Sequence, residues 1–487
     1  MPSRRGVLIG LGLGVPLVIA GRAATHLGLA AWHQRGGLPP VPEGFADDAG
    51  RFEQTPIAER IAIGNADPVA QIREAFARAR AQGRPISIAG ARHSMGGHTL
   101  TDGALVLDML GCNALALDER GRLRAGAGAR WSQVVEFLAG HGRAPWVMQA
   151  NNDFSLGGTL GANAHGWQHD KPPFVSTVES LRVVTSDGEL RECSRTANAE
   201  LFRAIAGGFG LLGVVVDMTV EIVDDEVYRS ETIECATTEY PEVFARRVAS
   251  PDVRMAYGRL SLDEHRLFTR ALFTTFTRVP GATIEPAQRS NAMWVARAVF
   301  RAQTGSDYGK RLRWDLERWW GSEAGERVAR SAILSHSVSG FSNRQPTRAD
   351  ILHEYFVPHR SFVGFVAAMR QILPHHAVDL INVTIRSVER DDDSLLPSAT
   401  VRMLALVLLF SVDHTATADA ALADLNRDLV DAVLAAGGTY YLPYRPHATA
   451  AQFLGAYPQA PEFFAAKRRW DPELLLRNRF FERYRTQ

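Results

Sequence analysis

The chain has 487 residues, of which 46% are hydrophobic, and its formal net charge at pH 7 is +1. This length and composition allow more than one domain with a large buried core, and the near-neutral charge argues against nucleic acid as the main partner. The three cysteines, Cys112, Cys193 and Cys235, form neither a disulfide framework nor a metal-binding pattern. We therefore expect a globular protein without a bound metal.

Residues 1–37 have the pattern of an export signal or membrane anchor. Arg4 and Arg5 precede a mostly apolar run from Gly6 to Ala20, and adjacent arginines before such a run are typical of twin-arginine signals. The run is short for a membrane-spanning helix, but an uncleaved anchor stays open. We expect an exported, periplasmic or otherwise extracytoplasmic protein, with a linker over residues 38–50, where prolines and glycines break regular structure.

After this linker, helices and strands alternate with glycine-rich turns. The pattern predicts helices over 67–82 and 131–141, strands over 84–89, 104–109 and 211–222, and a hairpin over 181–193 around Asp187-Gly188. Beyond about residue 225, strands and amphipathic helices mix without such turns. This change predicts a second domain over 226–444.

The first glycine-bearing turn, residues 90–97 (GARHSMGG), directly follows the predicted strand 84–89. Such a turn exposes successive backbone N–H groups that can cradle a pyrophosphate. Its spacing differs from the G-x-G-x-x-G fingerprint of dinucleotide-binding folds. On its own, the turn fits a simple connection between strands as well.

Two further segments combine glycines with other small residues. Residues 152–167 read NDFSLGGTLGANAHGW, and residues 207–215 read GGFGLLGVV. Glycine allows a backbone to approach a flat ring or a phosphate closely. The three segments in this order are far more specific than any one of them.

Together the segments resemble the FAD-binding domain of the vanillyl-alcohol-oxidase superfamily, the PCMH-type fold. The resemblance covers about residues 58–224 and returns at 467–472 (KRRWDP) and 478–484. Within the superfamily, residues 352–358 and 445–447 are similar to cap sequences of aldonolactone and alditol oxidases.

The resemblance implies an α+β fold: a two-subdomain PCMH-type FAD-binding domain over 51–225, divided near Asn113, plus an α+β cap (substrate) domain over 226–444. The C-terminal segment 445–487 is expected to return to the FAD domain. It also implies FAD as the cofactor. The implied FAD-binding residues are Gly90, Ala91, Arg92, His93, Ser94, Gly96, Gly97, Ser155, Gly157, Gly158, Thr159, Asn163, His165, Gly166, Gly210, Gly213, Val214 and Val215.

His93 lies where many family members bind the flavin covalently through an imidazole, so the resemblance implies a covalent link there. No cysteine lies near residues 149–161, so we expect no second, cysteinyl link. For catalysis the resemblance implies Arg386, His447 and Tyr355, with Glu354 as a weaker candidate. An arginine can orient a substrate oxygen or stabilise the reduced flavin, and a histidine can accept the hydroxyl proton. The alternative for Arg386 is a surface ion pair, and the alternative for His447 is a histidine that only caps a helix.

The chain departs from the sugar oxidases in its cap. Their Glu-x-Arg pair is matched by Thr384-Ile385-Arg386, and their His-Trp-Gly-Lys run is matched only at His447. The resemblance therefore implies the flavin chemistry more firmly than the substrate.

We expect an FAD-dependent oxidoreductase that oxidises a CH–OH group of a polyol, sugar or aldonolactone-like molecule by hydride transfer to flavin N5, with O₂ as acceptor. One alternative is a dehydrogenase that passes electrons to a membrane quinone or cytochrome, which the N-terminal apolar run and Trp314, Trp319 and Trp320 favour. The other is a non-catalytic flavin-binding protein of the envelope.

Overall fold

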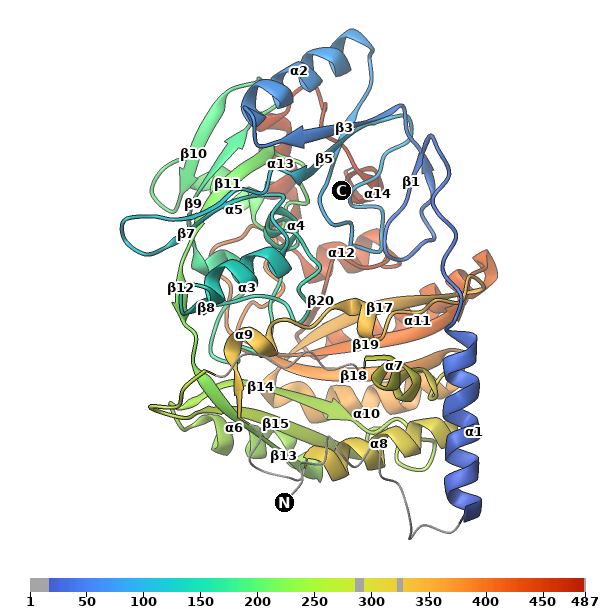
Figure 1. Ribbon diagram of the computed structural model, residues 1–487. Helices are drawn as coiled ribbons and strands as arrows, with labels where there is room; N and C mark the ends of the chain where they lie inside the picture. The colour runs from blue at the N-terminus through green and yellow to red at the C-terminus, as the bar shows by residue number, and fades with distance from the viewer. Residues whose placement is uncertain (1–16, 285–292, 322–326, 486–487) are drawn as a thin grey trace.

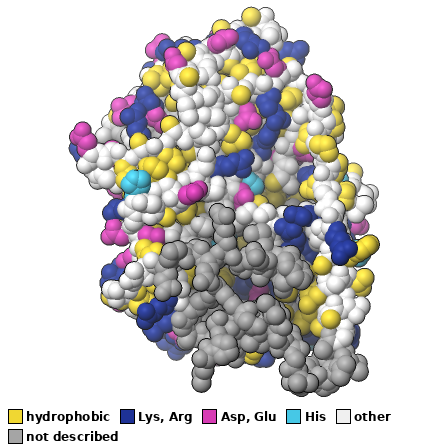
Figure 2. All heavy atoms as spheres, viewed as in Figure 1, with side chains coloured by type: hydrophobic (Ala, Val, Ile, Leu, Met, Phe, Trp, Pro, Cys, Tyr) yellow, Lys and Arg dark blue, Asp and Glu magenta, His cyan; other side chains and the backbone are white. Residues whose placement is uncertain are grey.

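The computed structural model describes residues 17–284, 293–321 and 327–485. The predicted twin-arginine motif and most of the apolar run after it lie outside these residues. Figure 1 shows the cofactor part above one large sheet, with α1 (Leu17–His33) along the side of that sheet. No helix in the described ranges has both the length and the apolar character needed to cross a membrane. On the face in Figure 2, basic and acidic side chains are interspersed.

The first subdomain is a three-stranded parallel sheet in the order β3-β5-β4. Its strands are β3 (Glu59–Gly64), β4 (Ile86–Ala89) and β5 (Leu105–Gly111). Parallel neighbours need a crossover, and α2 (Pro68–Ala81) provides it between β3 and β4. The Asp67 carboxylate caps α2 by accepting from the Ala70 N–H at 3.0 Å. Ile72 and Phe76 pack the buried face of α2 against this sheet, which confirms the predicted helix.

The second subdomain is a five-stranded antiparallel sheet in the order β10-β9-β11-β7-β6. Its strands are β6 (Leu115–Leu117), β7 (Leu123–Gly126), β9 (Val178–Val184), β10 (Leu190–Ser194) and β11 (Val214–Val220); its helices are α3 (Trp131–Ala139), α4 (Leu156–Ala162) and α5 (Ala199–Ile205). β8 (Arg143–Pro145) pairs with β12 (Ile222–Asp224) beside it. The β9–β10 hairpin is confirmed. β11 begins later than predicted, because Phe209 and Gly210 have positive φ in the turn before it.

The cap is an eight-stranded antiparallel sheet in the order β16-β13-β15-β14-β18-β19-β17-β20. Its strands are β13 (Val227–Ala236), β14 (Val253–Leu260), β15 (Arg270–Arg278), β16 (Arg327–Ala329), β17 (Arg348–Pro358), β18 (Asp379–Val388), β19 (Met403–Asp413) and β20 (Thr439–Tyr440). The helices are α6 (Tyr240–Val248), α7 (Met293–Arg301), α8 (Asp307–Gly321), α9 (Arg330–Ile333), α10 (Phe362–Ile372) and α11 (Ala416–Ala435). On α8, Trp314 is buried and Trp319 is exposed.

Both ends of the described chain pack onto these parts. α1 docks on the cap, where the His26 ring lies 2.5 Å from the Ala302 carbonyl and Arg22 lies over the Tyr308 ring. Residues 38–50, predicted as a linker, partly pack against the rest of the protein. Within them, β1 (Phe45–Ala46) pairs with β2 (Thr55–Pro56), and Asp48 is buried.

The C-terminal segment carries α12 (Ala450–Ala456), α13 (Ala460–Trp470) and α14 (Arg479–Tyr484). Between α13 and α14 it pairs with the open edge of β4. The Ile86 N–H donates to the Leu475 carbonyl, and the Arg477 N–H donates to the Ile86 carbonyl, both at 2.8 Å. The C-terminus therefore completes the first subdomain.

Candidate functional site

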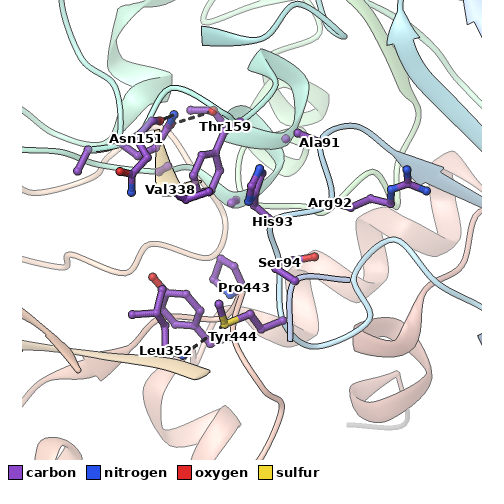
Figure 3. A pocket seen from close by; sticks show the side chains of 18 of the residues that line it. Ala91, Arg92, His93, Ser94, Asn151, Thr159, Val338, Leu352, Pro443 and Tyr444 are labelled. Carbon is purple, nitrogen blue, oxygen red and sulfur yellow. Dashed lines mark hydrogen bonds between the residues drawn. The ribbon is translucent and has the colours of Figure 1, made fainter. Parts of the chain in front are cut away.

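A cavity of about 1110 Å³ lies between the cofactor part and the cap sheet. Figure 3 shows Ala91, His93 and Thr159 on one side of it and Leu352 and Tyr444 on the opposite side. One wall therefore comes from the glycine-rich segments and the other from the cap. The volume exceeds the range of about 300–1,000 Å³ usual for a single small ligand, so the cavity has room for more than one.

The first two glycine segments meet along the cofactor wall. The Ala91 N–H donates to Ser155 Oγ at 3.2 Å. A Cβ atom at Gly90 would lie 2.1 Å from the same Oγ, so any side chain there would displace Ser155 and break this bond. Behind the second segment, Trp131 Nε1 donates to Thr159 Oγ1 at 2.8 Å, and Thr159 donates to Gln149 at 2.9 Å. The Ala91–Ser155 bond links the two loops, and the other two bonds support the second loop from behind.

The third segment turns sharply before β11. Gly210 has a φ of 73°, a left-handed conformation that glycine adopts without strain. A Cβ atom at Gly213 would lie 2.5 Å from the Val183 side chain. The turn therefore brings bare backbone to the cavity, with Val215 beside it.

The cofactor wall fits a large, flat, anionic cofactor such as FAD. Six of its positions are glycines and offer backbone without side chains: Gly90, Gly157, Gly158, Gly161, Gly210 and Gly213. Several buried polar atoms of residues that line the cavity, among them Ser94 Oγ and Trp167 Nε1, have no hydrogen-bond partner among the described residues. Buried polar groups normally have partners, and a bound flavin nucleotide can supply them.

His93 faces this cavity and stacks on Phe154, with ring centroids 4.4 Å apart and an angle of 25° between the rings. Burial lowers the pKa of His93, although the nearby Asp153 acts in the opposite direction. The neutral imidazole is therefore favoured, and the neutral form is the one with a nucleophilic nitrogen.

The cap wall follows the two-residue alternation of its strands. On β17, Leu352 and Glu354 line the cavity, whereas Tyr355 points to the opposite face and its hydroxyl accepts from Asn426 of α11 at 2.8 Å. On β18, Arg386 lines the cavity. The structure thus brings Arg386 to the site as predicted, places Glu354 there, and directs Tyr355 away from it.

Glu354 is the centre of a buried polar group. His165 Nε2 lies 2.7 Å from Glu354 Oε1, and both side chains are at most 3% exposed. The Tyr444 hydroxyl donates to the same carboxylate at 3.3 Å, and Arg386 Nη1 donates to the His165 carbonyl at 3.4 Å. Burial alone would raise the pKa of Glu354, but His165 and Arg386 together hold it below its ordinary value. Glu354 is therefore a carboxylate that can orient and polarise the His165 ring.

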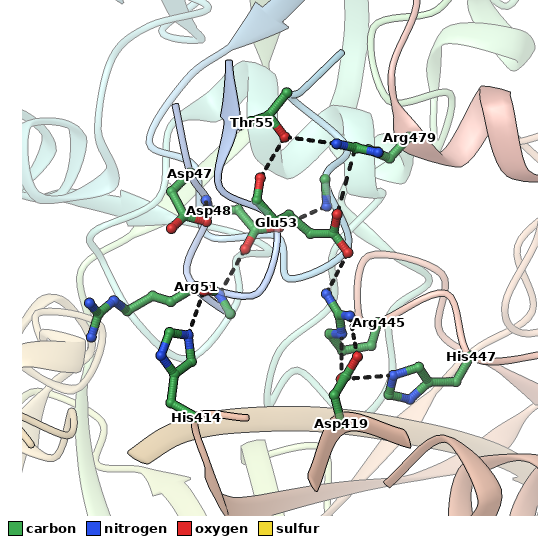
Figure 4. A network of polar contacts seen from close by, with 12 residues as sticks. Asp47, Asp48, Arg51, Glu53, Thr55, His414, Asp419, Arg445, His447 and Arg479 are labelled. Atoms are coloured by element: carbon green, nitrogen blue, oxygen red, sulfur yellow. Dashed lines mark hydrogen bonds and ion pairs between the residues drawn. The ribbon is translucent and has the colours of Figure 1, made fainter. Parts of the chain in front are cut away.

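His447 lies outside the cavity, in the ion network of Figure 4. Its Nε2 atom is 3.1 Å from Asp419, which also pairs with Arg445. Arg445 in turn reaches Glu53 at 2.6 Å. The network joins the cap to Glu53, and it places His447 away from the cavity, contrary to the expected position in the site.

Several predicted cofactor residues also support the wall from behind. Gly96, Gly97, Asn163, Gly166 and Val214 do not line the cavity. The Asn163 amide donates to Asp391 at 2.8 Å and accepts from Val175, and the Gly97 N–H donates to Asp48 at 2.7 Å. A Cβ atom at Gly166 would lie 1.9 Å from the Met148 carbonyl oxygen. The other thirteen predicted cofactor residues line the cavity.

Sequence reasoning missed most of the cap wall. Trp167 stacks on Tyr257 of β14, with ring centroids 4.7 Å apart. Arg259 follows on the same face of β14, and both β14 residues line the cavity. The alternating pattern of residues 253–260 could have predicted a strand there. It does not show which face of that strand lines the cavity.

A family model described as an FAD binding domain matches residues 63–194. This range contains the first two glycine segments, β5 at the centre of the first sheet and β9 of the second sheet. The chain carries an FAD-binding domain of the PCMH type.

Curated proteins match about a third of this chain. An uncharacterized oxidoreductase from the fasciation locus of Rhodococcoides fascians is 35% identical over 159 residues, 32% of this chain and 35% of the relative. L-gulonolactone oxidase of Bos taurus is 30% identical over 156 residues, 32% of this chain and 36% of the relative. Decaprenylphosphoryl-beta-D-ribose oxidase of Mycolicibacterium smegmatis is 29% identical over 168 residues, 34% of this chain and 36% of the relative. The chain matches little more than a third of each relative's length.

The family model lies within the FAD-binding domain and does not reach the cap. The family model and the relatives confirm FAD as the cofactor and the α+β PCMH-type fold.

Proposed function

We propose that the protein is an FAD-dependent oxidoreductase that oxidises a CH–OH group of a polyol, sugar or aldonolactone-like substrate. The His165–Glu354 pair joins the second glycine segment to β17 of the cap at 2.7 Å and carries this proposal. Oxidation of an alcohol requires a group that accepts the hydroxyl proton. Bound FAD supplies the acceptor for the hydride.

In this proposal, His165 accepts the hydroxyl proton and Glu354 stabilises the resulting imidazolium. Arg386 orients the substrate oxygen from β18, and its Nε atom has no protein partner among the described residues. Tyr444 fixes the Glu354 carboxylate from the other side. The aromatic pair Trp167–Tyr257 lines the same cavity and offers an apolar surface to the carbon chain of the substrate.

The names of two relatives support a sugar-derived substrate, since one is an L-gulonolactone oxidase and another a decaprenylphosphoryl-beta-D-ribose oxidase. A third is a cytokinin dehydrogenase of Oryza sativa, so the domain itself does not fix the donor. The alcohol class is therefore supported by the cap groups and by the first two relatives together.

The proposal includes O₂ as the electron acceptor and an extracytoplasmic location. Export is supported only by the Arg4-Arg5 motif before its apolar run. Cell fractionation of wild type and a variant with lysine at both arginines measures the location. If the wild-type protein is cytosolic and the lysine variant has the same distribution between cell fractions, the proposed export is wrong.

The central test is anaerobic mixing of the FAD-loaded protein with polyols, sugars, aldonolactones and hydroxy acids. We expect one class to bleach the visible flavin band, and air to restore it. If the bleached flavin stays reduced in air and is reoxidised by a quinone, the protein is a dehydrogenase and not an oxidase. A flavin that no compound in the panel bleaches would contradict the proposed oxidation.

A further inference from the structure

The far end of the cap wall holds two arginines that share one carboxylate. Arg259 of β14 and Arg313 of α8 each donate to Glu317 Oε1 at 2.8 Å. Both guanidinium groups also donate to the Asn382 side-chain oxygen, Arg313 at 3.2 Å. Arg259, Arg313 and Asn382 all line the cavity, whereas Glu317 stands behind them.

This cluster carries one positive charge more than its carboxylate can balance. Other charged side chains of the cap wall are matched: Arg348 pairs with Asp413 at 3.1 Å, and Asp350 pairs with Arg301. Near the proposed reaction centre, Arg386 lies close to the Glu354 carboxylate. The uncompensated charge of the cap wall is therefore concentrated at Arg259 and Arg313.

Arg259 also keeps donors free for a ligand. A guanidinium has five N–H donors, and among the described residues Arg259 uses one toward Glu317 and one toward Asn382. Its side chain is 20% exposed, whereas that of Arg313 is 7% exposed. Arg313 therefore holds the cluster in place, and Arg259 presents its remaining donors to the cavity.

Strand register gives the separation of this cluster from the reaction centre. Arg259 is the Cα partner of Thr384, two residues before Arg386 on β18. A strand rises about 3.3 Å per residue, so the Arg259 level lies about 7 Å from Arg386 and the Asn382 level about 13 Å from it. Trp167 and Tyr257 line the cavity beside this path. The shorter of these two distances is comparable to the length of an open monosaccharide chain.

We propose that the substrate carries an anionic group, a carboxylate or a phosphate, that binds Arg259 and Arg313 while its CH–OH end lies between Glu354 and Arg386. Arginine donors match both anions in geometry and charge. This inference rests on the proposed function and narrows its substrate class from sugars in general to acidic ones.

The test compares three six-carbon probes with the FAD-loaded protein: glucitol, gluconate and 6-phosphogluconate. Titration calorimetry measures each dissociation constant under anaerobic conditions, and steady-state kinetics measures KM for any probe that is oxidised. We expect at least one of the two acids to bind about 10-fold or more tightly than glucitol. A preference for gluconate identifies the carboxylate, and a preference for 6-phosphogluconate alone identifies the phosphate.

The decisive variant is Arg259→Gln, which should weaken binding of the preferred acid by about 10- to 100-fold, the loss expected for hydrogen bonds to a charged group. Glucitol binding should stay unchanged. Arg254→Gln is the matched control, because Arg254 lies on the same strand but outside the cavity and pairs with Glu226. Arg259→Lys keeps the charge without the planar fork, so it should fall between wild type and Arg259→Gln and serves if the glutamine variant fails to bind FAD.

Equal binding of all three probes to wild type, or an acid preference that survives both Arg259 variants, overturns the inference. A different result would contradict the proposed function itself, namely that no alcohol bleaches the flavin. Oxidation of an uncharged polyol with no acid preference would refute only the anionic-substrate inference.

Discussion

The two walls of the cavity are built in different ways. The cofactor wall is backbone from three compact segments, in which Gly90, Gly157 and Gly210 leave the peptide groups bare. The cap wall is side chains from separate strands, with Tyr257, Glu354 and Arg386 as representatives. A backbone wall suits one invariable cofactor, whereas single side-chain changes on the other wall alter the substrate without disturbing the fold. The family model covers two of the three glycine segments of the first wall and none of the cap strands.

The largest expected effect concerns the cofactor wall. We expect His93 to bind FAD covalently, because its neutral imidazole faces the cavity from the first glycine segment. Acid-precipitated wild type should stay yellow and give a fluorescent full-length band on a denaturing gel, and His93→Ala should lose both. His336→Ala, which also removes an imidazole from the cavity lining, should keep the link. A colourless wild-type pellet would place the protein among the non-covalent flavoproteins.

Behind the same wall, Asp48 should make stability depend on pH. Burial raises its pKa to about 7, although the Gly97 N–H bond acts in the opposite direction. Because the folded pKa exceeds the unfolded value of 3.8, the folded state holds the proton more strongly, and stability falls as pH rises from about 4 to about 7. The loss is at most about 4 kcal/mol. Unfolding midpoints measured across this range should vary less in Asp48→Asn, and parallel curves for the two proteins would contradict the assignment.

On the cap wall, Arg386→Ala should lower kcat and kcat/KM together by about 100-fold, equal to about 2.7 kcal/mol of transition-state stabilisation. An equal fall in both constants indicates an interaction made only in the transition state. The flavin content should not change, because the cofactor is held by the opposite wall. Arg402→Ala, at an arginine outside the cavity that pairs with Glu389, is the control. Unchanged kinetics would remove Arg386 from the site.

The smallest kinetic effect is expected at His447. His447→Gln should leave kcat within about twofold, because the ring points to Asp419 and not into the cavity. Loss of a buried charge-assisted bond should lower the free energy of unfolding by about 1–3 kcal/mol. Steady-state kinetics and urea unfolding separate the two effects. A fall in kcat comparable to that of Arg386→Ala would return His447 to the catalytic group.

The sequence predicted what depends on local pattern. The α2 helix follows from Asp67, Gly83 and apolar spacing, and the β9–β10 hairpin follows from its Asp187-Gly188 turn. The cofactor loops follow from contiguous motifs. The cap residues depend on which face of a strand is covered, and a shift of one residue reverses that face. Tyr355 and Glu354 differ by this single step, and only α11 packed behind β17 decides between them.

His447 illustrates a second limit of sequence reasoning. Its partner Asp419 belongs to α11, and the network continues to Glu53 near the other end of the chain. No spacing in the sequence relates these three positions. The residues around a histidine in such a segment therefore do not show whether its side chain forms a structural ion pair or transfers a proton in catalysis.

The pairing of the C-terminal segment with β4 also sets an order of events during synthesis. The Asn478 amide donates to the carbonyl of His98, 380 residues earlier in the chain, and to Phe209. The glycine loops leave the ribosome long before these late residues can support them, and contacts so distant in sequence form slowly. Until then β4 presents an open edge to other chains, which is a known route to aggregation. A nascent chain that stalls before Leu475 should therefore depend on chaperones, because the segment that covers the β4 edge has not yet been made.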